Sequence, residues 1–242
     1  MKYISCNLLF CFFVLCCNEA AGQSEAEANN AEVNYMIELI GEGKNATGSL
    51  SVLGTYHPLS PLLFKTDPFY TEETWNDAVI SYRGQVFSNL RLSYDINTGI
   101  LLMLHPKYGM PIKLQQDHVD WFDMSGMHFE SIKKGDGFYE VLFSGESIRL
   151  YKKSIKKDVA EDKSGTSETR TSAFYRREDT YYLDYKGELQ TVRKKRSYLQ
   201  LFPEYKAAFR SYYRDRVRTV IKADLDEANR LMAEFFNRVI EK

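Results

Sequence analysis

Alternating hydrophobic and polar positions dominate the middle of the chain. In FSNLRLSYDI, residues 87–96, apolar side chains at about every second position alternate with polar ones. A period of two is typical of a strand that buries one face. The NTG stretch at residues 97–99 has the composition of a three-residue hairpin loop, with Gly99 in a left-handed conformation. This pattern predicts two antiparallel strands joined by a tight turn.

Similar short apolar stretches continue along the chain at regular spacing. They lie at residues 110–114, 118–124, 127–132, 137–147 and 148–153, and residues 173–192 supply a last pair. Glycine-containing turns separate them, as is typical of consecutive antiparallel strands. We therefore predict an antiparallel β-meander within a β-rich domain at 35–195. The meander forms either a curled sheet or a barrel-like sheet.

The period changes after the last predicted strand. Ser197 and Gln200 stand three residues apart, as in a helix-capping box, and Asp224 and Glu227 repeat that spacing. Beyond Asp224, apolar residues recur every three or four positions, which predicts an amphipathic helix. We expect a C-terminal helical pair within residues 196–242, packed on the sheet. The fold class is accordingly α+β.

Two polar segments lack either period. Residues 23–34, QSEAEANNAEVN, are small and acidic, which predicts a disordered leader. Residues 156–172 are charged and contain no aromatic side chain. Because the strand pattern resumes afterwards, we interpret 156–172 as a mobile excursion between two strands.

The N-terminus has the order of features that defines a secretory signal peptide. Lys2 precedes an uninterrupted apolar core at residues 8–15, and the small residues Ala20 and Gly22 follow. The apolar stretch is shorter than the ~20 residues that a membrane-spanning helix needs. We predict a signal peptide at 1–22. The exported chain would begin at Gln23, in the periplasm or at the outer-membrane surface.

All four cysteines lie in the first 17 residues. The chain after them therefore has neither a disulfide framework nor a thiol nucleophile. Cys17 ends a loose lipobox and is a candidate for lipidation. Such motifs place a small residue just before the modified cysteine, whereas Cys16 stands there. A soluble chain is expected over a lipid-anchored one.

Charge is unevenly distributed along the chain. The net charge of −1 predicts no general attraction to nucleic acid or membranes. Residues 170–222, however, hold 14 lysines and arginines against six acidic residues, and Arg210, Arg214, Arg216 and Arg218 are among the basic ones. The densest run comprises Arg193, Lys194, Lys195 and Arg196. This patch predicts an anionic partner, such as an envelope protein, a lipid or a polysaccharide. The alternative is a solvated helix face that pairs with acidic residues of the sheet.

The segment QQDHVDWFDMSGMHF, residues 115–129, concentrates side chains that can bind a metal ion. On a strand, His118 and Asp120 would point to the same face. A turn at 125–126 would bring His128 back towards that strand. A His-Asp-His set suits zinc or a similar ion.

The same segment also fits a simple half-buried strand. In that alternative Val119, Trp121 and Met124 face the core, and the polar residues form an exposed face that needs no ion. No zinc-protease or paired-cysteine motif supports a metal site, so no cofactor is predicted.

Three functions remain open. The sequence lacks a nucleophile elbow or another recognisable catalytic motif, which favours a non-enzymatic binding or assembly module. A glycan-active or metal-dependent hydrolase is the first alternative, because Trp75 and Trp121 can stack on sugar rings and carboxylates on different strands can meet. A carrier of a small apolar ligand is the second alternative, if the meander closes into a barrel.

Several longer stretches carry a family resemblance: DPFYTEETWNDAVISYRGQVFSNLRLSYDI at 67–96, ILLML at 100–104, GFYEVLFSGESIRLYKK at 137–153, TYYLDYKGELQTVRKKRSYLQLFPEYKAAFRSYYRDR at 180–216, and the final helix. In these features the chain resembles a family of uncharacterised exported proteins of Bacteroidota. The resemblance covers about residues 53–240. It implies export in a Gram-negative bacterium, and it implies no established activity, ligand or catalytic residue.

Overall fold

The computed structural model describes residues 66–104, 109, 111–133, 135–161 and 172–241. The predicted signal peptide at 1–22, the leader at 23–34, the first part of the β-rich domain and Cys17 lie outside these residues. Most of residues 162–172 likewise lie outside.

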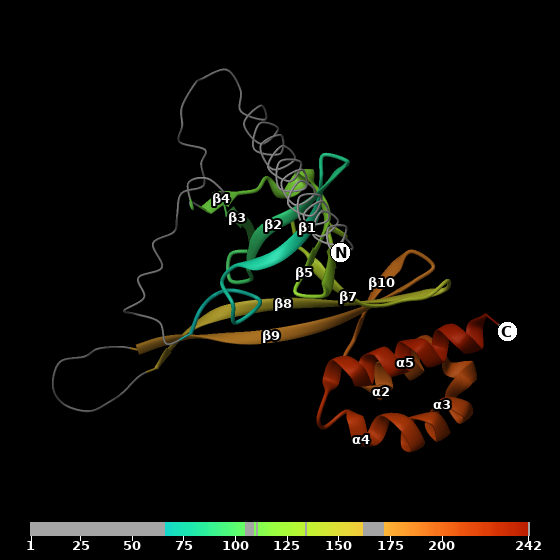
Figure 1. The fold of residues 1–242 in the computed structure, drawn as a ribbon. Helices are drawn as coiled ribbons and strands as arrows, with labels where there is room; N and C mark the ends of the chain where they lie inside the picture. Colours follow the sequence, from blue (N-terminus) through green and yellow to red (C-terminus); the bar gives the residue numbers. More distant parts are fainter. Residues whose placement is uncertain (1–65, 105–108, 110, 134, 162–171, 242) are drawn as a thin grey trace, which may run out of the picture.

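The described residues form one antiparallel sheet followed by helices (Figure 1). The strands are β1 (Asn76–Tyr82), β2 (Gln85–Asp95), β3 (Ile100–Leu104), β4 (Pro111–Lys113), β5 (Val119–Met124), β6 (Met127–Glu130), β7 (Tyr139–Ser144), β8 (Ile148–Glu161), β9 (Ser172–Tyr185) and β10 (Glu188–Val192). Their order is β10-β9-β8-β7-β6-β5-β1-β2-β3-β4. The predicted antiparallel meander is confirmed as a curled, open sheet. It is not a closed barrel, because β10 and β4 lie at opposite edges.

Several turns are set by local sequence. Arg83-Gly84, Ser125-Gly126 and Lys186-Gly187 each join two strands with both residues at positive φ. This conformation matches the twist of a two-residue hairpin. Gly99 also has positive φ, as predicted, but the loop between the paired residues Asp95 and Ile100 is four residues long.

β8 and β9 form a long two-stranded ribbon that corrects one prediction. Residues 156–161 belong to β8 and pair with β9, whereas the sequence predicts a mobile excursion from residue 156. The reason is long-range contact: Lys156 Nζ donates to the carbonyl oxygens of Asp67 and Phe69 at 2.9 and 2.5 Å. Lys157 and Asp158 of this segment are exposed, which is consistent with its polar composition.

A bulge in β5 reverses the expected facing of one aromatic residue. Along β1, Ser81 pairs with Trp121 and the next residue pairs with Val119, so Asp120 is extra. Val119 and Phe122 are buried as a result, and Trp121 lies on the other face at intermediate exposure. The expectation that Trp121 faces the core with Val119 is therefore wrong, because it assumed uninterrupted alternation.

The buried residues form two hydrophobic clusters. The first lies on β1–β6, where Phe122 and Phe129 stack with ring centroids 4.7 Å apart. The second joins β8–β10 to the helices, where the Phe202 and Phe236 rings lie 4.6 Å apart. The sheet thus continues past the first core and supplies one wall of the second.

The helical region contains α2 (Lys195–Leu201), α3 (Lys206–Tyr212), the π-helical segment η4 (Tyr213–Val217), α4 (Arg218–Val220) and α5 (Leu225–Ile240). It is thus more elaborate than the predicted pair. A 3₁₀ turn at Pro203–Tyr205 separates α2 from α3, because proline lacks the N–H that would continue a helix.

Neither predicted capping box forms in full, but Asp224 does cap its helix: the Asp224 N–H donates to the Val220 carbonyl oxygen, and the Glu227 carboxylate is bound by Arg230 instead of reaching back. Asp224 caps α5 by accepting a hydrogen bond from the Glu227 N–H at 2.9 Å. In contrast, α2 begins two residues before Ser197, whose hydroxyl instead accepts from the Arg193 N–H at 3.2 Å. This bond fixes the connection between β10 and α2.

Asn237 anchors α5 on the sheet. Its Oδ1 accepts from the N–H groups of Ser147 and Ile148 at 3.0 and 3.1 Å. Gly145 permits this approach, since a Cβ there would lie 2.3 Å from the Asn237 Oδ1. The missing side chain lets the helix dock against the β7–β8 turn.

Candidate functional site

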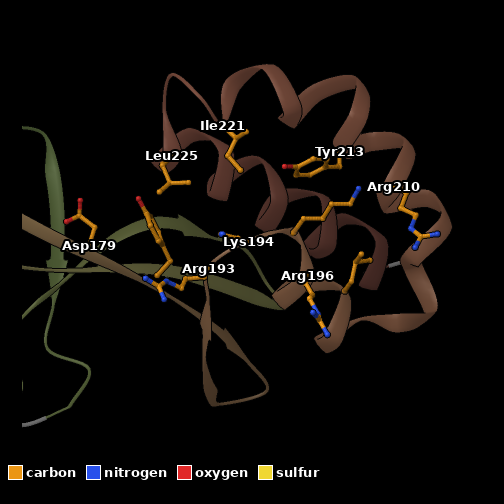
Figure 2. Close-up of a pocket in the computed structure, with 11 residues that line it drawn as sticks. Asp179, Arg193, Lys194, Arg196, Arg210, Tyr213, Ile221 and Leu225 are labelled. Carbon is orange, nitrogen blue, oxygen red and sulfur yellow. The ribbon is translucent and has the colours of Figure 1, made fainter.

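A pocket of about 780 Å³ opens between the C-terminal strands and the helices (Figure 2). Its lining residues are Asp179, Tyr181, Arg193, Lys194, Lys195, Arg196, Leu199, Arg210, Tyr213, Ile221 and Leu225. Five of these side chains are basic and one is acidic. The volume is that of a pocket for a small organic molecule.

The order of elements explains why the basic side chains converge. Residues 193–196 form the connection from β10 into α2, while Arg210 comes from the last turn of α3. The turn at Pro203–Tyr205 folds α3 back, so that Arg210 joins the 193–196 run at the same cavity. The predicted cationic patch is thus assembled in space from two segments.

The basic side chains of the pocket form no ion pair with a carboxylate of the described residues. Ion pairs among the described residues hold other basic groups, such as Arg177 and Arg230, but none of these five. The acidic residues of the described sheet therefore do not pair with the patch, which was the alternative interpretation.

Lys195 is the most constrained of the five. Its Nζ lies 4.3 Å from the ring centroid of Tyr213, a cation–π distance. Burial, together with the charge of the Arg210 guanidinium, lowers the pKa of Lys195 below the ordinary lysine value. An anion placed near these two side chains would relieve that repulsion.

Asp179, the one acidic residue of the lining, is already engaged. Its Oδ1 accepts from Ser154 Oγ at 2.5 Å and from Arg177 Nε at 2.9 Å. Asp179 therefore offsets little of the positive charge. Figure 2 shows it at one end of the pocket, opposite Arg210.

Tyr181 connects the pocket wall to a buried polar network. Its hydroxyl donates to Asp226 Oδ1 at 2.6 Å, and the other carboxylate oxygen of Asp226 lies 2.5 Å from Lys152 Nζ. Lys152 also pairs with Glu140 Oε2 at 2.5 Å, and the Tyr70 hydroxyl donates to Glu140. Burial and the bond to Asp226 raise the pKa of Tyr181. This network holds the start of α5 beside the pocket.

Apolar side chains complete the lining. Leu199 comes from α2, and Ile221 lies between α4 and α5. Leu225, the first residue of α5, is 43% exposed at the pocket. The pocket therefore offers a bound molecule both positive charge and apolar surface.

The run at 193–196 and Arg210 line the pocket, whereas Arg214, Arg216 and Arg218 of the same basic stretch do not. Sequence reasoning missed several other lining residues. The sequence marks the basic lining residues, because lysines and arginines are concentrated in that region; they are Arg193, Lys194, Lys195, Arg196 and Arg210. No sequence pattern distinguishes Tyr213, Ile221 or Leu225, because their aromatic or apolar side chains resemble ordinary core positions of amphipathic helices.

The candidate metal ligands are not brought together. His118 ends a 3₁₀ helix at Gln116–His118 instead of lying on a strand, and its Nδ1 accepts from Arg83 Nε at 3.2 Å. Asp120 Oδ2 accepts from Ser81 Oγ at 2.9 Å. Within the described ranges, no group of three or more His, Cys, Asp or Glu side chains is arranged to hold a metal ion.

His128 lies on β6, across from β5, as the predicted turn requires. Its Nδ1 is 2.5 Å from Asp123 Oδ1, and its Nε2 is 3.2 Å from Glu130 Oε1. Glu130 is also paired with Arg149 at 2.6 Å. The imidazole thus bridges two carboxylates within the sheet face, and neither His118 nor Asp120 is among its contacts.

No helix in the described part of the chain combines the length and the apolar character that crossing a membrane requires.

The fold and the pocket define an α+β protein with a cationic, partly apolar cavity between an open meander and a helical cap. Comparison of the chain with models of known families, with curated proteins and with solved structures finds no match in any of the three.

Proposed function

We propose that the protein is an exported, non-enzymatic binding module of the cell envelope, and that its cationic pocket binds an anionic ligand. The observation that carries the proposal is the convergence of five basic side chains on one cavity without a carboxylate partner among the described residues. Four of these residues are exposed and Lys195 is of intermediate exposure, so water screens their mutual repulsion, and a bound anion would interact favourably with several of them at once.

The pocket chemistry favours binding over catalysis. The lining contains basic, apolar and tyrosine side chains, and its one carboxylate, Asp179, is engaged by Arg177. General acid–base catalysis would require a titratable pair held near the reacting atoms. Among the described residues the candidate metal ligands lie apart and the sheet is open, so these observations give no support to a metal-dependent hydrolase or to a barrel carrier. A glycan-active hydrolase stays an alternative prediction that none of these observations tests.

A binding panel tests the proposal. Calorimetry would use dextran sulfate, inorganic phosphate and vesicles containing phosphatidylglycerol, each compared with a neutral counterpart. We expect at least one anionic probe to bind, with affinity that falls as salt concentration rises because the cations are partly exposed.

Charge variants locate the binding site. Arg196→Ala with Arg210→Ala should weaken binding by about tenfold, since charge-assisted contacts are lost. Arg216→Ala with Arg218→Ala removes the same charge from helical positions that do not line the pocket, and should have little effect. Equal loss in both double variants, or no binding of any anionic probe, would contradict the proposal.

Export is a separate part of the proposal. Its support is the order of Lys2, the apolar core at 8–15 and the small residues that follow. Mass spectrometry of the mature N-terminus would test it: Gln23, or its pyroglutamate form, indicates a soluble chain. A diacylglyceryl group on Cys17 indicates an anchored chain, and an intact Met1 in cells of the source organism contradicts export.

A further inference from the structure

We propose that the ligand of the pocket is an amphiphile with one anionic head, of phosphate or carboxylate chemistry, and an apolar tail. This inference rests on the proposed function, to which it adds the tail and the orientation of the bound molecule. Charge and apolar surface are unevenly distributed along the pocket.

The anionic head fits the end of the pocket near Arg210. Lys195 is held there over the Tyr213 ring, and Arg210 is close enough to contribute to the lowered pKa of Lys195. Arg196 lines the same cavity from the first turn of α2. Guanidinium groups suit a head with several acceptor oxygens, because they donate two parallel hydrogen bonds.

The opposite end of the pocket favours an anion less than the end near Arg210. Asp179 lies there (Figure 2), and its negative charge opposes that of a ligand. Asp179 is engaged by Arg177 and Tyr181 by Asp226, and Arg193 is the cation that Figure 2 labels towards this end. Lys195, Arg196 and Arg210 therefore place more positive charge at the other end, away from a carboxylate.

Apolar surface is available for the tail. Ile221 and Leu225 lie along one side of the cavity in Figure 2, from its middle towards the end near Asp179. Leu225 is 43% exposed, so a bound tail would remove it from water. A cavity of about 780 Å³ is also much larger than a lone inorganic anion would fill.

The orientation follows from these two ends. The head lies between Lys195, Arg196 and Arg210, and the tail runs past Ile221 and Leu225 towards Tyr181. Leu225 is the first residue of α5, and Asp226 next to it is held by Lys152. The apolar rim is therefore fixed by the same network that docks the helix.

Calorimetry with three probes tests the inference: dodecyl phosphate below its micellar concentration, inorganic phosphate, and dodecyl maltoside as the neutral detergent. We expect dodecyl phosphate to bind at least about tenfold more tightly than inorganic phosphate, since burying several methylene groups favours binding. Dodecyl maltoside should bind more weakly than dodecyl phosphate, because it lacks the charged head.

Two variants assign the tail contact. Leu225→Ser should weaken dodecyl phosphate about fivefold through lost apolar contact and leave inorganic phosphate unchanged. Val86→Ser is the matched control, because Val86 is 58% exposed on β2 and does not line the pocket. Ile221→Ser gives a second measurement, and thermal melts verify that each variant is folded.

The outcomes separate the two proposals. If inorganic phosphate binds as tightly as dodecyl phosphate, or if Leu225→Ser and Val86→Ser behave alike, the amphiphile is excluded and anion binding stands. If no anionic probe binds, both proposals fail. Competition of dodecyl phosphate by phosphatidylglycerol vesicles would identify a bilayer as the source of the amphiphile. Absence of competition would identify a dissolved monomer, and either result is compatible with the inference.

Discussion

Lys152 and Asp226 form an ion pair that joins the sheet to the last helix, with 2.5 Å between Nζ and Oδ2. Lys152 is 4% exposed and also pairs with Glu140. Burial alone would lower the pKa of Lys152, but Tyr70, Asp226 and Glu140 together raise it. The lysine is therefore held charged in the interior, where its loss would leave two carboxylates without a cation.

The first prediction concerns this pair. Lys152→Met should lower the free energy of unfolding by about 3–5 kcal/mol, because it leaves the Glu140 carboxylate, whose side chain is 10% exposed, without a cation. The Asp226 side chain is 40% exposed and contributes less. Lys157→Met is the matched control on the same strand, since its pair with Glu178 is exposed and should contribute at most about 1 kcal/mol. Chemical denaturation measures both. Similar small losses would show that the buried network does not stabilise the fold.

The second prediction concerns the anchor of α5. Asn237→Ala removes the acceptor of two N–H groups, of Ser147 and Ile148, and should cost about 1–3 kcal/mol. Gly145→Ala should also destabilise the protein, because the new Cβ would overlap Asn237 Oδ1. Since both changes act on one contact, the double variant should be less destabilised than the sum of the two. If denaturation shows that the two losses in the free energy of unfolding are additive, Asn237 and Gly145 do not stabilise the fold through one shared contact.

The third prediction concerns alkaline pH. Burial raises the pKa of Tyr94 to about 12, and burial together with the Glu140 charge raises the pKa of Tyr70 to about 12. Unfolded tyrosine titrates near pH 10. Because the folded pKa is the higher one, this stability is fully present below about pH 10 and is lost as pH rises towards 12.

The loss in the free energy of unfolding at alkaline pH should be about 2–3 kcal/mol for Tyr94 alone, because its folded pKa lies about two units above the unfolded value. The measurement is tyrosinate absorbance as a function of pH, recorded with and without denaturant. The folded protein should retain a group of tyrosines that titrate late and together with unfolding. If the tyrosines titrate in one step that is the same with and without denaturant, the prediction of raised pKa values for Tyr70 and Tyr94 in the folded protein is wrong.

The fourth prediction concerns the cap of α5. Asp224→Ala should cost about 1 kcal/mol, because the N–H of Glu227 loses its acceptor. Asp224→Ser retains a capping oxygen and should cost distinctly less. Thermal or chemical denaturation compares them, and equal effects of the two variants would indicate that the cap contributes little.

The fifth prediction links Lys195 to ligand binding. Since its pKa is lowered by burial and Arg210, Lys195 loses its proton at a lower pH than an ordinary lysine. Affinity for dodecyl phosphate should therefore fall as pH rises through that lowered pKa. Lys195→Arg should remove this pH dependence, because arginine stays protonated. Calorimetry at several pH values gives the comparison, and an unchanged pH profile in Lys195→Arg would assign the effect to another group.

Local sequence patterns were sufficient for much of the architecture. The alternation at residues 87–96 lies in β2, and the Asp224 spacing marks the start of α5. Both patterns involve only residues close together in sequence, so they predict local structure without knowledge of the rest of the chain. The run of basic residues at 193–196 likewise predicts a charged surface, although it does not predict that Arg210 lies at the same pocket.

Long-range contacts decided the remainder. Residues 156–161 look like a polar excursion, yet Lys156 binds the carbonyl oxygens of Asp67 and Phe69, far away in sequence. One extra residue at Asp120 turned Trp121 away from the core, which a strict period of two could not anticipate. The capping box at Ser197 failed because its hydroxyl accepts from Arg193 instead.

The sequence by itself determined the α+β class, the succession of strands and helices, and the concentration of positive charge, because these depend on periodicity and composition. Only the tertiary structure decided that the sheet stays open and that Arg210, Tyr213 and Leu225 meet the 193–196 run at one pocket. That meeting depends on the turn at Pro203–Tyr205 and on the docking of α5 through Lys152 and Asn237. No local pattern of residues predicts the direction of that turn or those contacts, because both depend on residues far apart in sequence.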